Sequence, residues 1–329
     1  ARHSGPGRSS PDPTNPDCRS NLTPLTHGAT ADVCAPPDRK DNMRYPKQMP
    51  KRLCVQPSAT VSLLEPETLQ ARLQNSDNNN LLLVQVSSED NFLQAHIPGA
   101  VLVTPSSLVC GIPPATGKLP GLDHLNELFS NLGYEPGLDI IIYDDEGGGW
   151  AGRFAWTLDV IGHRSWQYLN GGLHAWHGEG LPLAQGPAAR RPATLTNLSI
   201  DTGPIAEVSD VLATIGDDEQ VVWDVRSAEE YAGLRQVSAR VGHVPGAVNL
   251  DWLLLQDPAR QYRFVQDIAS KLEALGISQA KTIITHCQTH HRSGLSYMLG
   301  RLLGLPIRAY HGSWSEWGNL PDTPIELST

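Results

Sequence analysis

An internal repeat constrains this chain more than any other feature of its sequence. The motif HIPGAV at 96–101 returns as HVPGAV at 243–248, and a later strand–loop–helix stretch repeats with Gly152 opposite Gly294. The segment GGLHAW that begins at Gly171 returns in the same way as GSWSEW. Two copies of one domain follow from these matches.

The repeat divides the 329 residues into domains. The first copy is predicted at 59–184 and the second at 205–329, joined by a linker at 185–204 that contains Pro, Ala and Gly. Residues 1–57 hold ten of the 26 prolines, many polar residues and no hydrophobic periodicity. Such a segment cannot bury enough apolar surface to offset its ordering entropy. We therefore predict a disordered N-terminal extension and assign no function to it.

Each copy alternates short apolar runs with stretches that have the length of helices. The runs are the predicted strands at 81–84, 140–143, 220–223 and 282–285. Apolar runs of this kind are typical of parallel strands that are buried on both faces. After the second strand of each copy comes a loop and then a predicted helix, at 152–161 and 293–303. This alternation predicts an α/β fold with mainly parallel sheets flanked by helices.

Composition excludes several classes of function. The net charge of -10 disfavours a nucleic-acid binder, which usually carries a basic face. The five cysteines form no CxxC pair, so no zinc site is predicted, and their scarcity indicates a reduced, cytoplasmic location. No apolar run approaches the roughly 20 residues of a membrane span. The run Gly147–Gly149 lacks the GK[ST] ending of a phosphate-binding loop, and we expect neither metal nor cofactor.

Cys287 is the candidate nucleophile. It follows the strand 282–285 in the run HCQTHHRSG, where its neighbours are polar and cationic. The carboxyl end of a parallel strand is where α/β folds bind ligands, and the next helix directs its free N–H groups into this loop. These N–H groups and Arg292 favour the thiolate form. A buried structural cysteine is the alternative, and the polar neighbours argue against it.

Two HxPGA motifs, one Cys-x4-Arg loop and a terminal GSWSEW segment together resemble the tandem-domain rhodanese family over residues 59–329. The loop CQTHHRS is especially similar to that of bacterial two-domain thiosulfate sulfurtransferases. The resemblance implies two tandem rhodanese-like domains and a thiosulfate:cyanide sulfurtransferase that works by double displacement. It also implies that the first domain is catalytically silent.

The resemblance assigns the chemistry to the loop that contains Cys287. The thiolate would take the outer sulfur of thiosulfate, release sulfite and pass the sulfur from a persulfide to cyanide or a thiol. Backbone N–H groups of the loop would stabilise the persulfide anion, and Arg292 would hold a thiosulfate oxygen. His290 and His291 are either cations that attract the donor or solvated loop residues. The predicted substrate-binding residues are Arg292, His290, His291, Gln288, Thr289 and Ser293.

The two copies differ at this loop. With the repeated glycines aligned, the first copy has Asp145 in the place of Cys287. The three cationic positions of the second copy are occupied in the first by Gly148, Gly149 and Trp150. A carboxylate repels an anionic donor and cannot form a persulfide. The first copy is therefore predicted to be silent and to wall the cleft.

Charges at another strand end also distinguish the copies. Asp224 and Arg226 follow the first long strand of the second copy, where the first copy has Gln85 and Ser87. They either support the active site or form an ion pair that holds the strand end. Glu230 stands where many eukaryotic thiosulfate and mercaptopyruvate sulfurtransferases carry an arginine, so that substrate contact is not transferred to this chain.

Several other residues are assigned to the fold. His96 and His243 occur in both copies, including the one without a nucleophile, and are predicted to be structural. His286 is predicted to point away from the thiol. Trp314 and Trp317 are predicted to pack at the end of the last repeat. A position lining the mouth of the cleft is the further expectation for them.

Three other functions remain open. A mercaptopyruvate sulfurtransferase resembles this chain in fold but typically has a small Cys-Gly-Ser/Thr-Gly loop, unlike the bulky loop here. A phosphatase or arsenate reductase uses Cys-x5-Arg to hold a tetrahedral oxyanion, and this loop is one residue shorter. Nothing in the sequence excludes a persulfide carrier that hands sulfur to a protein acceptor, and steady turnover would separate an enzyme from such a carrier.

Overall fold

The computed structural model describes residues 61–75, 80–188 and 191–328, and the predicted extension at 1–57 lies outside this part of the chain. The strands of the first copy are β1 (Ser62–Leu64), β2 (Leu81–Val86), β3 (Val101–Val103), β4 (Asp139–Asp144) and β5 (Trp166–Leu169). Its helices are α1 (Pro66–Gln74), α2 (Glu89–Gln94), the 3₁₀ helix η1 (Pro105–Leu108), α3 (Leu122–Asn131), α4 (Gly149–Val160) and α5 (Gly172–Gly178).

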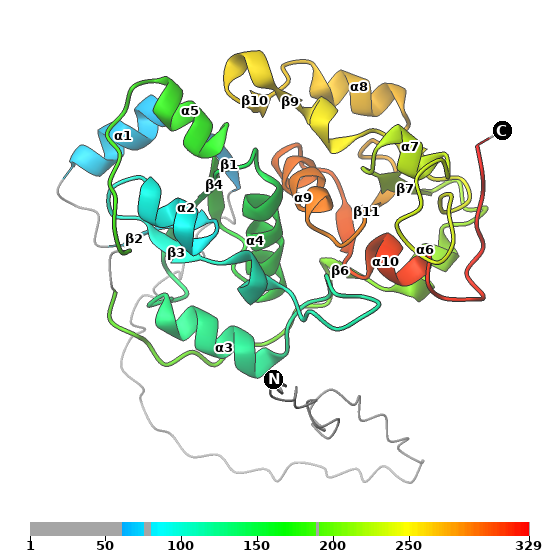
Figure 1. Cartoon of the computed structure of the whole chain (residues 1–329), viewed down its shortest axis with the longest axis horizontal. Helices are drawn as coiled ribbons and strands as arrows, with labels where there is room; N and C mark the ends of the chain where they lie inside the picture. Colours follow the sequence, from blue (N-terminus) through cyan, green and yellow to red (C-terminus); the bar gives the residue numbers. More distant parts are fainter. Residues whose placement is uncertain (1–60, 76–79, 189–190, 329) are drawn as a thin grey trace, which may run out of the picture. The chain divides into compact units, whose positions relative to one another are not determined.

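The second copy repeats this alternation of strands and helices, as Figure 1 shows. Its strands are β6 (Ile205–Ala206), β7 (Gln220–Asp224), β8 (Val248–Asn249), β9 (Gln256–Asp257), β10 (Arg263–Phe264), β11 (Thr282–His286) and β12 (Ile307–Tyr310). Its helices are α6 (Val208–Ala213), α7 (Ala228–Tyr231), η2 (Trp252–Leu255), η3 (Pro258–Arg260), α8 (Ile268–Ala274), α9 (Arg292–Leu302) and α10 (Ser313–Trp317).

The two copies build sheets with the same strand order. The first sheet has the order β1-β5-β4-β2-β3, and the second has the order β6-β12-β11-β7-β8. All neighbours in both sheets are parallel, whereas β9 and β10 form a separate antiparallel pair. Parallel neighbours require crossover connections, which the intervening helices supply. The predicted α/β fold of two mainly parallel sheets is confirmed.

The central strands carry mainly apolar residues at their middle positions because both faces of each sheet are buried. In β4, Ile140 and Ile142 belong to one core cluster, and Ile141 and Tyr143 belong to another, as the two-residue period of a strand requires. The first of these clusters continues into the second copy, where Ile283 of β11 is part of it. The two copies therefore share one hydrophobic core.

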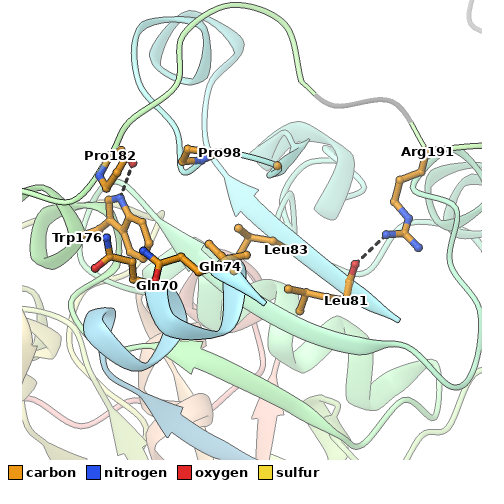
Figure 2. Close-up of a pocket in the computed structure, with 10 residues that line it drawn as sticks. Gln70, Gln74, Leu81, Leu83, Pro98, Trp176, Pro182 and Arg191 are labelled. Carbon is orange, nitrogen blue, oxygen red and sulfur yellow. Dashed lines mark hydrogen bonds between the residues drawn. The ribbon is translucent and has the colours of Figure 1, made fainter. Parts of the chain in front are cut away.

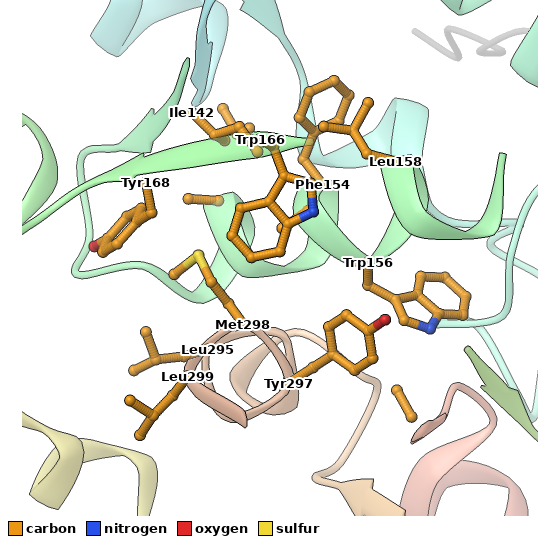
Figure 3. Packing of buried hydrophobic residues seen from close by; sticks show 14 of the residues in the cluster. Ile142, Phe154, Trp156, Leu158, Trp166, Tyr168, Leu295, Tyr297, Met298 and Leu299 are labelled. Carbon is orange, nitrogen blue, oxygen red and sulfur yellow. The ribbon is translucent and has the colours of Figure 1, made fainter. Parts of the chain in front are cut away.

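The helices α4 and α9 make a close backbone contact between the copies. A Cβ atom on Gly152 would collide with the carbonyl group of Gly294, and one on Gly294 would collide with the backbone nitrogen of Arg153. Figure 3 shows apolar side chains around this contact, among them Phe154 from α4 and Met298 from α9, in one buried cluster. The glycine that aligns the two repeats is thus the residue that lets the two helices cross. The crossing brings together the loops that precede the two helices.

The residues assigned to the fold are buried. The imidazoles of His96 and His243 each bond to a backbone carbonyl of the preceding helix and stack on an aromatic ring. Trp314 and Trp317 pack in the core of the second copy with at most 1% of their surface exposed, so they do not line a cleft mouth. This packing agrees with their predicted position at the end of the last repeat.

Candidate active site

Cys287 begins the loop 287–291, named here the Cys287 loop, between the carboxyl end of β11 and the first residue of α9. The strand lies in the middle of its sheet, which is where the ends of parallel strands form ligand sites. The cysteine is 1% exposed. The imidazole of His286 turns toward Asp224, at 3.6 Å, and its Nδ1 lies 3.1 Å from the Cys287 carbonyl oxygen. It points away from the thiol, in line with its predicted direction.

The surroundings of Cys287 favour an ionised sulfur. Burial by itself raises the pKa of the thiol, but the charge of Arg292 and the hydrogen bonds from Ser293 outweigh burial, and His291 adds to them. The resulting pKa lies below the ordinary value of a thiol. The hydroxyl of Ser293 donates to Sγ over 3.5 Å. Because the thiolate is the reactive form of cysteine, these surroundings suit a nucleophile.

Arg292 is held by a carboxylate. Its Nη1 donates to Oε2 of Glu230 at 2.6 Å, and its Nη2 donates to Oε1 at 2.9 Å. Although burial opposes both charges, the contact lowers the pKa of Glu230 and raises that of Arg292. Glu230 also forms a capping box with Ser227 at the start of α7. The sequence reasoning missed this pairing, and the pattern Ser-x-x-Glu at 227–230 could have marked the helix start.

Asp224 and Arg226 form a fully buried ion pair at the end of β7. The guanidinium Nη2 lies 2.5 Å from Oδ2 of Asp224 and donates to the carbonyl of Gly242 at 2.8 Å. Burial raises the pKa of Asp224, but the charges of His286 and Arg226 outweigh it, so the pKa is lowered. The guanidinium also lies over the ring of Trp314, 4.2 Å from its centroid. The pair holds the strand end and reaches the Cys287 loop through His286.

Gln288 and Thr289 connect the Cys287 loop to its walls. The amide of Gln288 donates to the carbonyl of Val237 and the hydroxyl of Ser238, both at 3.2 Å. The backbone of Thr289 lies against Gly117 of the first copy, where a Cβ atom would collide with the Thr289 carbonyl. One side of the loop therefore rests on its own domain and the other on the first copy.

His290 and His291 lie in different surroundings. His290 is fully buried, its Nδ1 lies 2.8 Å from the hydroxyl oxygen of Ser293, and its ring meets Trp156 edge to face at 4.6 Å. His291 is partly exposed, pairs with Glu146 of the first copy, and stacks on Trp150 with ring centroids 4.5 Å apart. Of the two imidazoles, that of His291 is the one that could meet a donor in solution. No signal in the sequence marks the contact with Glu146.

The loop 145–148 of the first copy is named here the Asp145 loop, and its polar groups are bonded by side chains of the first copy itself. The carboxylate of Asp144 accepts hydrogen bonds from the backbone N–H groups of Gly147, Gly148 and Ala151 at 2.7 to 3.1 Å. Burial raises the pKa of this carboxyl to about 6, with Glu146 adding to the rise. Asp145 accepts hydrogen bonds from the side chains of Ser87 and Asn91 at 2.9 and 2.8 Å.

A cavity of about 440 Å³ opens in the first copy at the start of β2, away from both loops (Figure 2). Leu81 and Leu83 line it together with Trp176, whose indole N–H donates to the carbonyl of Pro182 at 2.8 Å. Arg191 donates to the carbonyl of Leu81 at 2.7 Å. The described residues that line this cavity include no nucleophile, and we assign it no part in the chemistry.

The described residues bear on two further kinds of feature, a metal centre and a membrane-spanning helix. Within these residues, no group of three or more His, Cys, Asp or Glu side chains is placed to hold a metal ion. No helix in this part of the chain combines the length and the apolar character that a membrane crossing requires.

Comparison with known proteins places the fold and the loop in a family. The model of the rhodanese-like domain matches residues 65–179 and again residues 207–320. The chain is 47% identical over 266 residues to a thiosulfate sulfurtransferase of Azotobacter vinelandii, covering 80% of this chain and 97% of that protein. A protein of the same name from Pseudomonas aeruginosa is 46% identical over the same shares. This chain belongs to the rhodanese-like family, as the motifs predicted.

Two more distant similarities are informative, one in sequence and one in fold. The sulfur carrier protein TtuD of Thermus thermophilus is 32% identical over 212 residues, which cover 60% of this chain and 74% of that protein. The crystal structure of YnjE matches with a TM-score of 0.73 and 19% identity, over 81% of this chain and 68% of that chain. The likeness to YnjE is one of fold alone.

Proposed function

We propose that this chain is a thiosulfate sulfurtransferase in which Cys287 carries the sulfur from donor to acceptor. The observation that carries the proposal is the setting of the thiol, which is buried at a helix start beside the hydroxyl of Ser293 and has its pKa lowered by Arg292. Two relatives at 47% and 46% identity are thiosulfate sulfurtransferases, which supports thiosulfate as the donor.

The proposed reaction has two displacements. In the first, the Cys287 thiolate attacks the outer sulfur of thiosulfate; a sulfur–sulfur bond forms at Sγ, and the bond within thiosulfate breaks with its electron pair leaving on sulfite. In the second, cyanide or a thiol attacks the outer sulfur of the persulfide, and the electron pair of the broken bond returns to Sγ. The thiolate is regenerated, so neither oxidant nor cofactor is required.

Arg292 and His291 are the proposed anion-binding groups. A guanidinium has five N–H donors, and the contact with Glu230 uses two of them, so donors remain for an oxygen of thiosulfate. His291 adds a partly exposed ring that stacks on Trp150 of the first copy. The N–H groups of Gln288, Thr289 and Ser293 are proposed to face the persulfide.

A persulfide carrier is the second candidate function. The similarity to the sulfur carrier protein TtuD favours it, and the chemistry of the first displacement is the same for a carrier and an enzyme. A protein acceptor would then replace cyanide. The cytoplasmic location predicted from cysteine usage remains a prediction.

Intact mass tests the proposal. The full chain is incubated with thiosulfate, freed of excess and weighed, and we expect one added sulfur atom that cyanide removes. Cys287→Ala should add none. Cys110→Ala is the matched control, because Cys110 is the other described cysteine and is only partly buried, and this variant should still accept sulfur.

Each outcome decides between the candidates. Sulfur on Cys287 with repeated turnover in the presence of cyanide supports the enzyme, and a single stoichiometric transfer supports the carrier. If thiosulfate adds no sulfur but mercaptopyruvate does, mercaptopyruvate would replace thiosulfate as the proposed donor. Sulfur that persists on the Cys287→Ala variant would overturn the assignment of the nucleophile.

A further inference from the structure

A line of three side chains runs from the reacting sulfur into the interior of the protein. The hydroxyl of Ser293 donates to Sγ of Cys287 at 3.5 Å, and the same oxygen lies 2.8 Å from Nδ1 of His290. All three side chains are buried, and the imidazole ends against Trp156 of the first copy. Solvent therefore does not compete for these hydrogen bonds, which makes their direction important.

The proton count fixes the tautomer of His290. Ser293 has one hydroxyl proton and gives it to the sulfur, so the short contact with His290 requires the proton to be on Nδ1. The other ring nitrogen, Nε2, then has only a lone pair, and it has no hydrogen-bond partner among the described residues. A buried acceptor without a partner is less rare than a buried N–H without one, which favours this tautomer. Burial, together with the charges of Arg153, His311 and His291, holds the pKa of His290 well below its usual range, so the ring stays neutral.

The backbone at His290 is in the left-handed region, with φ at 55°. The corresponding residue of the first copy is Gly148, with φ at 97°, so both loops need this conformation at the same position. Glycine adopts it freely, whereas a side chain is strained there. The second copy nevertheless has a histidine. The residue that corresponds to Ser293 is Ala151, which has no hydroxyl. Both members of the line thus occur only in the copy that has the cysteine.

We propose that His290 is a positioning residue for the reaction: it donates to Ser293, orients the Ser293 hydroxyl toward Cys287, and thereby stabilises the sulfur anion of the thiolate and of the persulfide. The inference deepens the proposed function, on which it rests only for Cys287 as the reacting group. No proton passes along the line, because the thiol proton goes to solvent and His290 stays neutral. The charged or titratable groups that face the line are Arg292 and His291 from the second copy, Arg153 from α4, and His311 before α10.

The test is the pH dependence of Cys287 alkylation by iodoacetamide, followed on the peptide that contains Cys287. H290G copies the first domain and relieves the strained backbone, so the fold should persist. We expect the midpoint of alkylation to move up by about one pH unit, with about tenfold slower alkylation below it, because the anion loses an oriented donor. S293A should move the midpoint at least as far. H290N should restore part of the shift, since asparagine tolerates the left-handed region and has an N–H donor.

Two further variants make the test specific. The double variant H290G/S293A should shift no further than S293A alone, since both changes act through one hydroxyl. S296A is the matched control, because Ser296 is equally buried on the same helix and its hydroxyl bonds to Thr285 and to the backbone carbonyl of Ser293, not to the sulfur. Its midpoint should stay at the wild-type value.

The outcomes separate this inference from the proposed function. A shift in S293A without one in H290G would overturn the role of His290. No shift in either variant would overturn the roles of both Ser293 and His290. If H290G does not fold, as thermal unfolding would show, H290N and the double variant H290N/S293A decide, and a midpoint that moves further in H290N/S293A than in S293A alone would contradict the inference. Alkylation uses no sulfur donor, so a chain that shifts as expected but takes no sulfur from thiosulfate would lose the proposed donor and keep His290 in this role.

Discussion

The Asp145 loop and the Cys287 loop occupy the same position in two sheets of the same strand order, and they differ in what fills them. In the Asp145 loop, the carboxylate of Asp144 takes the backbone N–H groups of Gly147 and Gly148. The residue at that position in the second copy is His286, whose ring turns to Asp224 instead. The side chain at this position in the second copy therefore takes none of the N–H groups of the Cys287 loop, which we propose face the sulfur.

We infer from this comparison how the first copy keeps its fold without taking part in the chemistry. Asp144 supplies an internal anion to the N–H groups of the Asp145 loop, at the position where the second copy is proposed to accept an external one. The first copy then contributes surfaces instead: Gly117 lies under Thr289, and Glu146 and Trp150 hold His291. We propose that the first domain, silent in the reaction, supplies one wall of the catalytic cleft in this way.

The largest expected effect comes from moving the nucleophile to the other copy. The double variant C287S/D145C should have activity at least about 10³-fold below the wild type, because the Asp145 loop has Trp150 where the second copy has Arg292 and its N–H groups are already taken. Sulfite release and intact mass after exposure to thiosulfate measure the effect. D145C alone should retain wild-type turnover. Measurable persulfide at position 145 of the double variant would break the comparison.

The next effect is on stability, at the helix crossing that both copies need. Gly152→Ala should lower the free energy of unfolding by about 3 kcal/mol or more, because the new methyl group meets backbone atoms of α9 that cannot move aside. Urea unfolding measures it. Gly137→Ala is the control, since its Cβ would meet nothing within 4 Å, and it should change the stability by under about 0.5 kcal/mol.

The internal anion of the Asp145 loop should make stability depend on pH. Burial raises the pKa of Asp144 from 3.8 to about 6, so the folded state binds this proton more readily than the unfolded state. The group therefore adds stability as pH falls from about 6 toward 3.8, and its ionised form costs stability above pH 6. Relative to D144N, the wild type should gain about 2 kcal/mol between pH 7 and pH 4. Equal pH profiles for the two proteins would contradict the raised pKa.

The smallest expected effect tests the contact between Glu146 of the first copy and His291. Glu146→Gln should raise the KM for thiosulfate about threefold and leave kcat unchanged, because the pair with His291 is partly exposed and such pairs are weak. Steady-state kinetics at low salt measure it, with Glu135→Gln on the same domain as the control. A fall in kcat without a change in KM would show that Glu146 acts on the chemical step instead.

Much of this protein was predictable because its signals are local. The apolar runs at 140–143 and 282–285 became β4 and β11 with one or two residues added, since a strand buried on both faces is marked by consecutive apolar residues. The polar and cationic residues that surround Cys287 in the sequence predicted a thiol in electropositive surroundings. The partner of Arg292 was not predicted, because Glu230 lies 62 residues away and only the packing of α7 beside the loop brings the two together.

The alternation of buried strands and helices, the repeat and the place of Cys287 at a strand end are properties of the sequence by itself, since each depends on neighbours in the chain. The tertiary structure alone decided that His290 faces inward to Ser293 while His291 faces Glu146, and that Asp144 fills the loop of the first copy. The physical reason is that the backbone φ and ψ angles of a loop set the direction in which each side chain points, so adjacent side chains can point in different directions. Those angles are set by contacts from distant segments, here the crossing of α4 and α9.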